Sequence, residues 1–303
     1  MKNIIFFGSI PAIVTPFKKN GDLDLPALEK IVEYQLKGGV DAIVVVGSTG
    51  EAATLSEEEY VTVIQKVVAV VKKVSKKVPV IAGAGSNDTK KAVHFSKLAK
   101  IAGADGLLHV TPYYNKPMPN GLVLHYKEIA KAVDLPIIIY NVPGRTGSNV
   151  LPQTILRIAR EVPTVVAVKE ASGSIKQMVE IINGVKQNGP KDFVVLAGDD
   201  AIALELIALG GKGCISVVCN EVPKLFSEMI HLALEGKIEK AKKLHHQILE
   251  LMNVNFIESN PIPVKAALSM MGLIENSLRL PLTKLEDKNK VLVEKALKGL
   301  KLI

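Results

Sequence analysis

Short apolar runs recur along the chain, and the segments between them carry apolar residues at helical spacing. A short apolar run bounded by turn residues is typical of a buried strand, whereas an apolar stripe at helical spacing is typical of an amphipathic helix. The runs predict strands at 10–15, 42–47, 80–83, 106–111, 137–141, 165–169, 193–198 and 213–218. The intervening segments predict helices at 24–38, 56–76, 89–102, 121–133, 152–161, 174–187 and 200–209. Ser56 and Glu59 have the spacing of a capping box, which supports a helix start at this point.

Eight strands that alternate with helices predict a parallel sheet, and eight units favour closure into a (β/α)8 TIM barrel over an open sheet. An open dinucleotide-binding sheet would show a glycine-rich turn after its first strand, and the residues at 15–17 (Thr-Pro-Phe) are not such a turn. Further helical patterns follow at 222–234, 237–253, 262–271 and 285–299, of which the first can close the barrel. We therefore expect an α/β fold with a catalytic barrel at 1–235 and a C-terminal helical extension at 236–303.

Lys169 stands at the end of the sixth predicted strand, directly after four small or β-branched apolar residues. Side chains alternate along a strand, so Lys169 is expected to share a face with Val165 and Ala167, while Val166 and Val168 take the other face. Burial disfavours the charged form of a lysine, and a neutral amine is a nucleophile toward ketones. The alternative is that Lys169 pairs with a nearby carboxylate or reaches solvent at the rim, and the strand alone leaves both interpretations open.

The charge of the chain does not require a polyanionic partner. The chain has 303 residues, of which 48% are hydrophobic and 22% are charged, and its formal net charge is +8. Many lysines stand where a solvated surface explains them, such as Lys72 and Lys73 at the end of a predicted helix, where cations complement the helix dipole. Aromatic residues make up 4% of the chain and tryptophan is absent, so there is little platform on which bases could stack. We therefore expect no nucleic-acid partner. The positive charge of the protein should still attract small anionic substrates.

The cysteines and the N-terminal residues point to a cytoplasmic protein. Cys214 and Cys219 lie five apart in one predicted strand, hence on opposite faces, and cannot easily form a disulfide. Residues 1–7 are too short for the core of a signal peptide, and no stretch reaches membrane-spanning length. We therefore expect no membrane association.

Polar residues stand at the predicted carboxyl ends of several strands, where a barrel of this kind places its reacting groups. Ser48 and Thr49 follow the second strand between two glycines, and hydroxyls with free backbone N–H groups at a helix start can hold a carboxylate. The glycines alone are equally consistent with a tight turn. Tyr140 ends the fifth strand and can be either a reactive phenol or a core tyrosine with a satisfied hydroxyl.

Arg145 follows the fifth strand and can be a ligand-binding group or an ordinary loop residue. For Asp199 and Asp200, after the seventh strand, we expect the role of caps on the helix that follows. The six histidines show no metal-ligand spacing with acidic or cysteine partners, so no metal is assigned.

Taken together, these motifs resemble those of the dihydrodipicolinate synthase family, within the superfamily of pyruvate-dependent class I aldolases and N-acetylneuraminate lyases. The superfamily pattern is carried by the loop 47–51 (Gly-Ser-Thr-Gly-Glu), by Tyr140 and by Lys169. The family itself is indicated by the stretch 112–117 (Pro-Tyr-Tyr-Asn-Lys-Pro) and by Arg145. Family members usually have two threonines where this chain has Ser-Thr, a pattern typical of the lyase branch.

The resemblance implies that Lys169 forms a Schiff base with pyruvate, whose carboxylate rests on Ser48 and Thr49. Tyr140 would carry protons, linked through Ser48 to a Tyr114 that reaches across a dimer interface, in a homodimer or a homotetramer. No metal or organic cofactor is required.

The resemblance further implies that the backbone around Gly198 and Ile215 shapes the pyruvate pocket. Arg145 would bind the carboxylate of L-aspartate 4-semialdehyde, and the product would be an intermediate of lysine biosynthesis. A related lyase that acts on N-acetylneuraminate or a 2-keto-3-deoxy sugar acid would have less use for this arginine. A non-catalytic barrel would have no reason to keep the lysine, the tyrosine and the hydroxyl loop together.

The resemblance also bears on regulation. Lysine-sensitive members carry a glutamate where this chain has Lys91, and that glutamate pairs with the ammonium of the effector. Like charges repel at short distance, so we expect L-lysine to inhibit this protein weakly or not at all.

Overall fold

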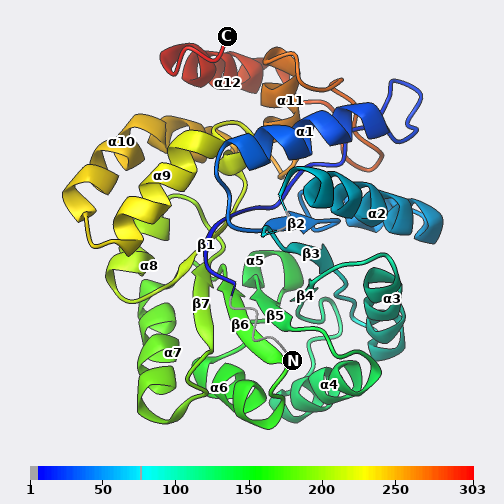
Figure 1. The fold of residues 1–303 in the computed structure, drawn as a ribbon, viewed down its shortest axis with the longest axis vertical. Helices are drawn as coiled ribbons and strands as arrows, with labels where there is room; N and C mark the ends of the chain where they lie inside the picture. Colours follow the sequence, from blue (N-terminus) through cyan, green and yellow to red (C-terminus); the bar gives the residue numbers. More distant parts are fainter. Residues whose placement is uncertain (1–5, 76) are drawn as a thin grey trace.

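Eight parallel strands form one sheet in the computed structural model, which describes residues 6–75 and 77–303 (Figure 1). The strands are β1 Gly8–Pro11, β2 Ile43–Val45, β3 Val80–Gly83, β4 Gly106–Val110, β5 Ile137–Asn141, β6 Val165–Glu170, β7 Val194–Ala197 and β8 Gly213–Ser216. Their order is β1-β8-β7-β6-β5-β4-β3-β2, and a bridge between Ala12 and Val44 brings the two ends of this order together. The predicted (β/α)8 barrel is confirmed.

Helices follow the strands and surround the barrel. They are α1 Leu25–Lys37, η1 Ala52–Thr54, α2 Glu57–Val74, α3 Thr89–Ile101, α4 Pro119–Ala132, α5 Pro143–Thr146, α6 Pro152–Glu161, α7 Ile175–Asn188, α8 Ala203–Ala208, η2 Val218–Asn220 and α9 Pro223–Leu234. The predicted capping box is present, because Ser56 Oγ accepts from the N–H of Glu59 at 3.2 Å and the Glu59 carboxylate accepts from the N–H of Ser56 at 3.0 Å. Residues 1–5 of the predicted barrel and residue 76 of the predicted helix 56–76 lie outside the described residues.

Two predicted strands differ from those in the structure for reasons of hydrogen bonding. The first strand begins at Gly8 and ends at Pro11. Beyond Ala12 its N–H groups no longer pair with β8, since that of Ile13 donates to Val44 and that of Val14 to the side chain of Asn220. The eighth ends at Ser216, and Cys219 therefore lies in η2 and not in the strand. Both cysteines are buried and free. The one-turn helix α5 was not predicted, because its four residues are too few to show a period.

The alternation along β6 is interrupted. Ala167 belongs to the cluster inside the barrel, and Val168 to the cluster between the strands and the helices, as predicted. Val165 lies in the outer cluster and Val166 packs against the inner one, so the prediction for these two residues was wrong. The register of β5 against β6 shifts at this point, since Ile137 pairs with Val165 and the next residue pairs with Ala167. An extra residue in one strand exchanges the faces of the residues before it.

Apolar side chains fill the interior of the barrel and form the floor on which the candidate site rests. They include Ile10, Val44, Ile81, Leu108, Ile138, Leu196 and Ile215. A second and larger core lies between the strands and the helices and continues into the C-terminal part of the chain.

The C-terminal helices are α10 Ile238–Val254, α11 Ile262–Met270 and α12 Asp287–Gly299. Helix α10 packs against α9, and α12 packs against both α10 and α11 (Figure 1). In Figure 1 α11 and α12 lie on the same side of the molecule as α1. The division of the chain at residue 235 stays a prediction. Of the helices in the described part of the chain, none is both long enough and apolar enough to cross a membrane.

Candidate active site

A cleft lies at the carboxyl ends of the strands, where barrels of this kind hold their reacting groups. Its lining combines residues from the strand ends with two residues from the C-terminal part of the chain. The lining residues are Ala12, Val44, Gly47, Ser48, Thr49, Leu108, Tyr140, Arg145, Lys169, Gly198, Val217, Phe256 and Asn260. Six of the eight predicted site residues are therefore brought together.

Lys169 and Tyr140 face each other at the base of this cleft. They are direct neighbours in the pairing of β5 with β6, and the Lys169 Nζ lies 4.3 Å from the centroid of the Tyr140 ring. Lys169 is 5% exposed, and none of the ion pairs among the described residues involves it. The interpretation in which Lys169 pairs with a carboxylate finds no support. A buried amine beside a phenol is the arrangement that attack on a ketone needs.

Gly198 makes room for the lysine. A Cβ atom at this position would lie 3.1 Å from the Lys169 Cε and 2.6 Å from the Ala171 Cβ. A Cβ atom here would therefore require Ala171 to move and the lysine side chain to shift. The structure thus gives Gly198 a steric reason to stand at the end of β7.

A buried polar network behind the two reactive residues holds the ends of β5 and β6. The Glu170 carboxylate accepts hydrogen bonds from Asn141 Nδ2 at 2.9 Å, Gln177 Nε2 at 3.1 Å and the N–H of Ser172 at 2.7 Å. Asn149 bonds both Asn141 and Gln177. Asn141 follows Tyr140 on β5, and Glu170 follows Lys169 on β6. The network therefore fixes the backbone from which Tyr140 and Lys169 project. This network was not predicted.

The loop 47–51 leaves β2 through an unusual backbone conformation. Val46 has φ = 49°, which a β-branched residue adopts only under strain. The turn is possible because the neighbouring strand carries Gly83, where a Cβ atom would lie 2.3 Å from the Val46 carbonyl oxygen. The N–H groups of Ser48, Thr49 and Gly50 donate to none of the described residues. Ser48 and Thr49 line the cleft, so their N–H groups and hydroxyls are available to a carboxylate there.

Arg145 lies on α5 and is exposed at the side of the cleft. Its Nη2 donates to the carbonyl oxygen of Asn260 at 3.0 Å. The remaining N–H groups of the guanidinium can bind a second carboxylate at the mouth of the cleft.

Two predicted site residues do not line the cleft of the single chain. Tyr114 is 89% exposed and has φ = 72°, with its N–H donating to the carbonyl oxygen of Thr146. Ile215 is fully buried in the core inside the barrel, and the lining residue after β8 is Val217.

Asp200 has a different position from the one predicted. The N-cap of α8 is Ile202, which has no side-chain cap, and the Asp199 carboxylate accepts only from the N–H of Ala201. The buried Asp200 carboxylate accepts from the N–H groups of Val217 and Val218 at 3.1 and 2.8 Å. Burial raises the pKa of Asp200 above its usual value. The residue thus holds the segment after β8 in place instead of capping α8.

A buried ion pair attaches the loop 47–51 to the C-terminal part of the chain. Lys265 is fully buried on α11, and its Nζ bonds Glu51 Oε1 at 2.5 Å and the carbonyl oxygen of Thr15 at 2.9 Å. The other Glu51 oxygen accepts from the N–H of Arg279 at 3.1 Å. Burial lowers the pKa of Lys265, and the Glu51 carboxylate opposes this effect. Sequence reasoning missed this pair; the one signal was a lysine within the apolar helical pattern 262–271.

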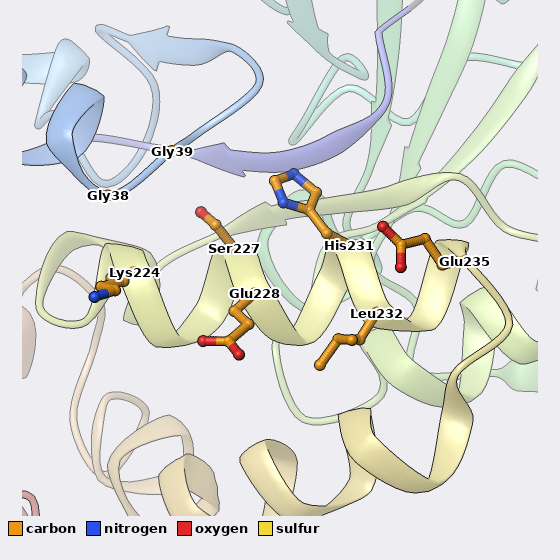
Figure 2. A pocket seen from close by; sticks show the side chains of 8 residues that line it. All are labelled: Gly38, Gly39, Lys224, Ser227, Glu228, His231, Leu232 and Glu235. Carbon is orange, nitrogen blue, oxygen red and sulfur yellow. The ribbon is translucent and has the colours of Figure 1, made fainter.

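A second hollow lies between the α1–β2 turn and α9 (Figure 2). His231 on its wall donates from Nε2 to the Asp41 carboxylate at 2.7 Å, and this bond raises the pKa of His231. Ser227 donates its hydroxyl proton to Ser9 Oγ and not to His231, so the three side chains do not form a nucleophilic triad. The hollow lies beside the amino ends of β1 and β2. In barrels of this kind the amino ends of the strands contribute to stability, whereas the reacting groups lie at the carboxyl ends.

Among the described residues, no group of three or more His, Cys, Asp or Glu side chains is placed to hold a metal ion.

Comparison with known proteins agrees with this geometry. The model of the dihydrodipicolinate synthetase family matches residues 5–300. A protein of Maridesulfovibrio salexigens named 4-hydroxy-tetrahydrodipicolinate synthase is 50% identical over 98% of this chain and 99% of its own length, and a protein of the same name from Methanocaldococcus jannaschii is 48% identical over 99% and 100%. The crystal structure of dihydrodipicolinate synthase from Thermotoga maritima superposes with a TM-score of 0.95, at 46% identity, over 99% of this chain and 100% of that one. The chain therefore belongs to the dihydrodipicolinate synthetase family.

Proposed function

We propose that this protein is a 4-hydroxy-tetrahydrodipicolinate synthase, a lyase of the class I aldolase type that condenses pyruvate with L-aspartate 4-semialdehyde. The observation that carries the proposal is the buried Lys169 beside Tyr140, in one cleft with the free donors of the loop 47–51. The names of the relatives, which match over nearly their whole length, support the same reaction.

The reaction begins when the neutral amine of Lys169 attacks the ketone carbon of pyruvate. The carbinolamine loses water to give an imine, and loss of a methyl proton converts the imine to an enamine. Tyr140, whose ring lies beside the amine, is the group that delivers and removes the protons of these steps. The enamine carbon then attacks the aldehyde, and attack of the substrate's own amine on the imine closes the ring and releases Lys169.

The cleft binds two carboxylates. The pyruvate carboxylate rests on the N–H groups and hydroxyls of Ser48 and Thr49. The semialdehyde carboxylate pairs with Arg145, whose planar guanidinium suits a bidentate contact. Gly198 leaves space for the lysine that carries the intermediate, and Ile215 supports the pocket from within the barrel.

The proton path is completed by a second copy of the chain. Tyr114 is exposed on a loop outside the cleft of its own chain, so it is available to reach the cleft of a neighbour in a homodimer or homotetramer. Sedimentation velocity of the purified protein measures the assembly, and a monomer with full activity would contradict this part of the proposal. The two buried free cysteines are consistent with a protein that works in the cytoplasm.

The substrate is tested by comparing aldol partners. We expect turnover of pyruvate with L-aspartate 4-semialdehyde, and far slower cleavage of N-acetylneuraminate or of a 2-keto-3-deoxy sugar acid. The Ser-Thr pair at 48–49 is the feature that favours the lyase alternative. Faster cleavage of a sugar acid than condensation of the semialdehyde would refute the proposed substrate while leaving the Schiff base intact.

A further inference from the structure

Asn260, from the C-terminal part of the chain, lines the cleft and contacts the loop 47–51. It precedes Pro261, the N-cap of α11, and is 6% exposed. Its side-chain Nδ2 donates to Thr49 Oγ1 at 2.9 Å, and its carbonyl oxygen accepts from Arg145 at 3.0 Å. One residue thus contacts both of the groups that bind carboxylates in the proposed function.

The direction of the bond to Thr49 determines what the threonine can do. A hydroxyl has one proton to donate and two lone pairs that accept. Since the amide of Asn260 donates to Thr49 Oγ1, the hydroxyl proton must point to another acceptor. Within the part of the chain that the structure describes, no acceptor for this proton lies in hydrogen-bond range. Thr49 lines the cleft, so its proton is left for a ligand.

The orientation of the Asn260 amide is supported by its surroundings. Its Oδ1 is buried without a partner among the described residues. The observed orientation leaves one N–H and the oxygen of the amide without a partner among the described residues. The opposite orientation would leave both N–H groups unpaired, and unpaired buried N–H groups are rarer in proteins than unpaired carbonyl oxygens. Thr15, by contrast, donates its proton to the carbonyl oxygen of Gly50 and can offer nothing to a ligand.

We propose that Asn260 is a positioning residue that makes the Thr49 hydroxyl an obligatory hydrogen-bond donor to the carboxylate of the keto acid bound on Lys169. This inference rests on the proposed function and deepens it. Asn260 acts through Thr49, and its effect falls on binding of the first substrate. Its contact with Arg145 is made by the backbone, so a change of side chain leaves the site of the second carboxylate in place.

Asn260→Asp is the sharpest test, because aspartate has the same shape and only accepts. It would take the Thr49 proton for itself and place a negative charge beside the carboxylate of the substrate. The pyruvate concentration that gives half-maximal borohydride trapping should rise by about 10-fold or more, the usual effect of losing a hydrogen bond to a charged group. The KM for the semialdehyde should stay within about 2-fold of wild type. In a Thr49→Ser background, which keeps the hydroxyl, the effect of Asn260→Asp should persist.

A merely structural role is separated from a positioning role by a double-mutant cycle. Thr49→Val removes the hydroxyl, after which Asn260→Ala should weaken pyruvate trapping by no more than about 2-fold further. If Asn260 only stabilised the fold, the two losses would multiply, and kcat and thermal stability would fall with them. This cycle decides the question even where Asn260→Asp fails to fold.

The outcomes are distinct. The inference is supported if pyruvate is trapped on wild type, if the Asn260 variants need more pyruvate for half-maximal trapping, and if their losses do not add to that of Thr49→Val. If Asn260→Asp needs no more pyruvate than wild type for half-maximal trapping, or if the losses of trapping multiply in the double-mutant cycle, the inference fails while the proposed function stands. Absence of any pyruvate adduct in wild type overturns the proposed function and the inference with it.

Discussion

The buried ion pair between Lys265 and Glu51 should be one of the largest single contributions to the position of the loop 47–51. Lys265→Met keeps most of the side-chain volume but removes the cation. The Glu51 side chain, which is 1% exposed, would then keep only the N–H of Arg279 as a partner for its charge. The carbonyl oxygen of Thr15 would lose its donor as well.

The expected cost follows from burial. Both side chains are almost completely inaccessible, so solvent cannot replace the lost partner. Removing one member of such a pair destabilises proteins by about 3–5 kcal/mol. Replacing both members is much milder, since no charge is left unpaired. In Lys265→Met with Glu51→Gln, the amide oxygen can still accept from Arg279, and the combined variant should be more stable than Lys265→Met alone by about 2 kcal/mol.

Urea unfolding followed by far-ultraviolet circular dichroism measures these differences, because the chain has no tryptophan for a fluorescence readout. Lys298→Met is a matched control, since the Lys298 side chain is 62% exposed and its pair with Glu294 lies on the surface; its free energy of unfolding should change by less than about 1 kcal/mol. The reasoning fails if Lys265→Met unfolds like the control, or if the costs of Lys265→Met and Glu51→Gln simply add.

Three further predictions concern specificity, regulation and pH. Arg145→Ala should lower kcat/KM for the semialdehyde by a factor on the order of 10² while pyruvate trapping is retained, and equal losses in both assays would indicate misfolding instead. Calorimetry with millimolar L-lysine should detect no saturable binding, because the exposed Lys91 on α3 repels the ammonium of the effector. Lys91→Glu should strengthen L-lysine binding if that position governs the site. Burial lowers the pKa of His109 to about 3 and that of His125 to about 4, so the unfolded chain binds more protons than the folded one below pH 6.5. The free energy of unfolding is therefore highest above pH 6.5 and decreases as the pH falls, by about 3 kcal/mol for each histidine at pH 4. His109→Gln should make the free energy of unfolding, measured by urea titration, depend less on pH, and an unchanged dependence would contradict the assignment.

Local patterns predicted the barrel and placed Lys169 in it, because strand and helix periods are properties of adjacent residues. The exchanged faces of Val165 and Val166 could not be predicted, since the register shift depends on how β5 pairs with β6. The same limit applies to Asp200, whose partners lie after the next strand.

The site itself was predicted where its residues stand at strand ends, and missed where they come from the C-terminal part of the chain. Asn260 and Lys265 act on Thr49 and Glu51, which are more than 200 positions away in the sequence. A single sequence shows that Lys265 interrupts an apolar helical pattern, but it does not show which residue the lysine contacts. Sequence reasoning predicted only a C-terminal helical extension, whereas Phe256 and Asn260, in the segment between α10 and α11, line the cleft.

The most direct test of the central claim is the identity of the residue that pyruvate modifies. Wild-type protein is incubated with pyruvate and borohydride, and its peptides are mapped by mass spectrometry beside those of Lys169→Arg. The proposed mechanism predicts one reduced pyruvyl group per chain, on Lys169, and none in Lys169→Arg, because arginine stays protonated. An adduct on another lysine, or an unmodified wild-type chain, would contradict it.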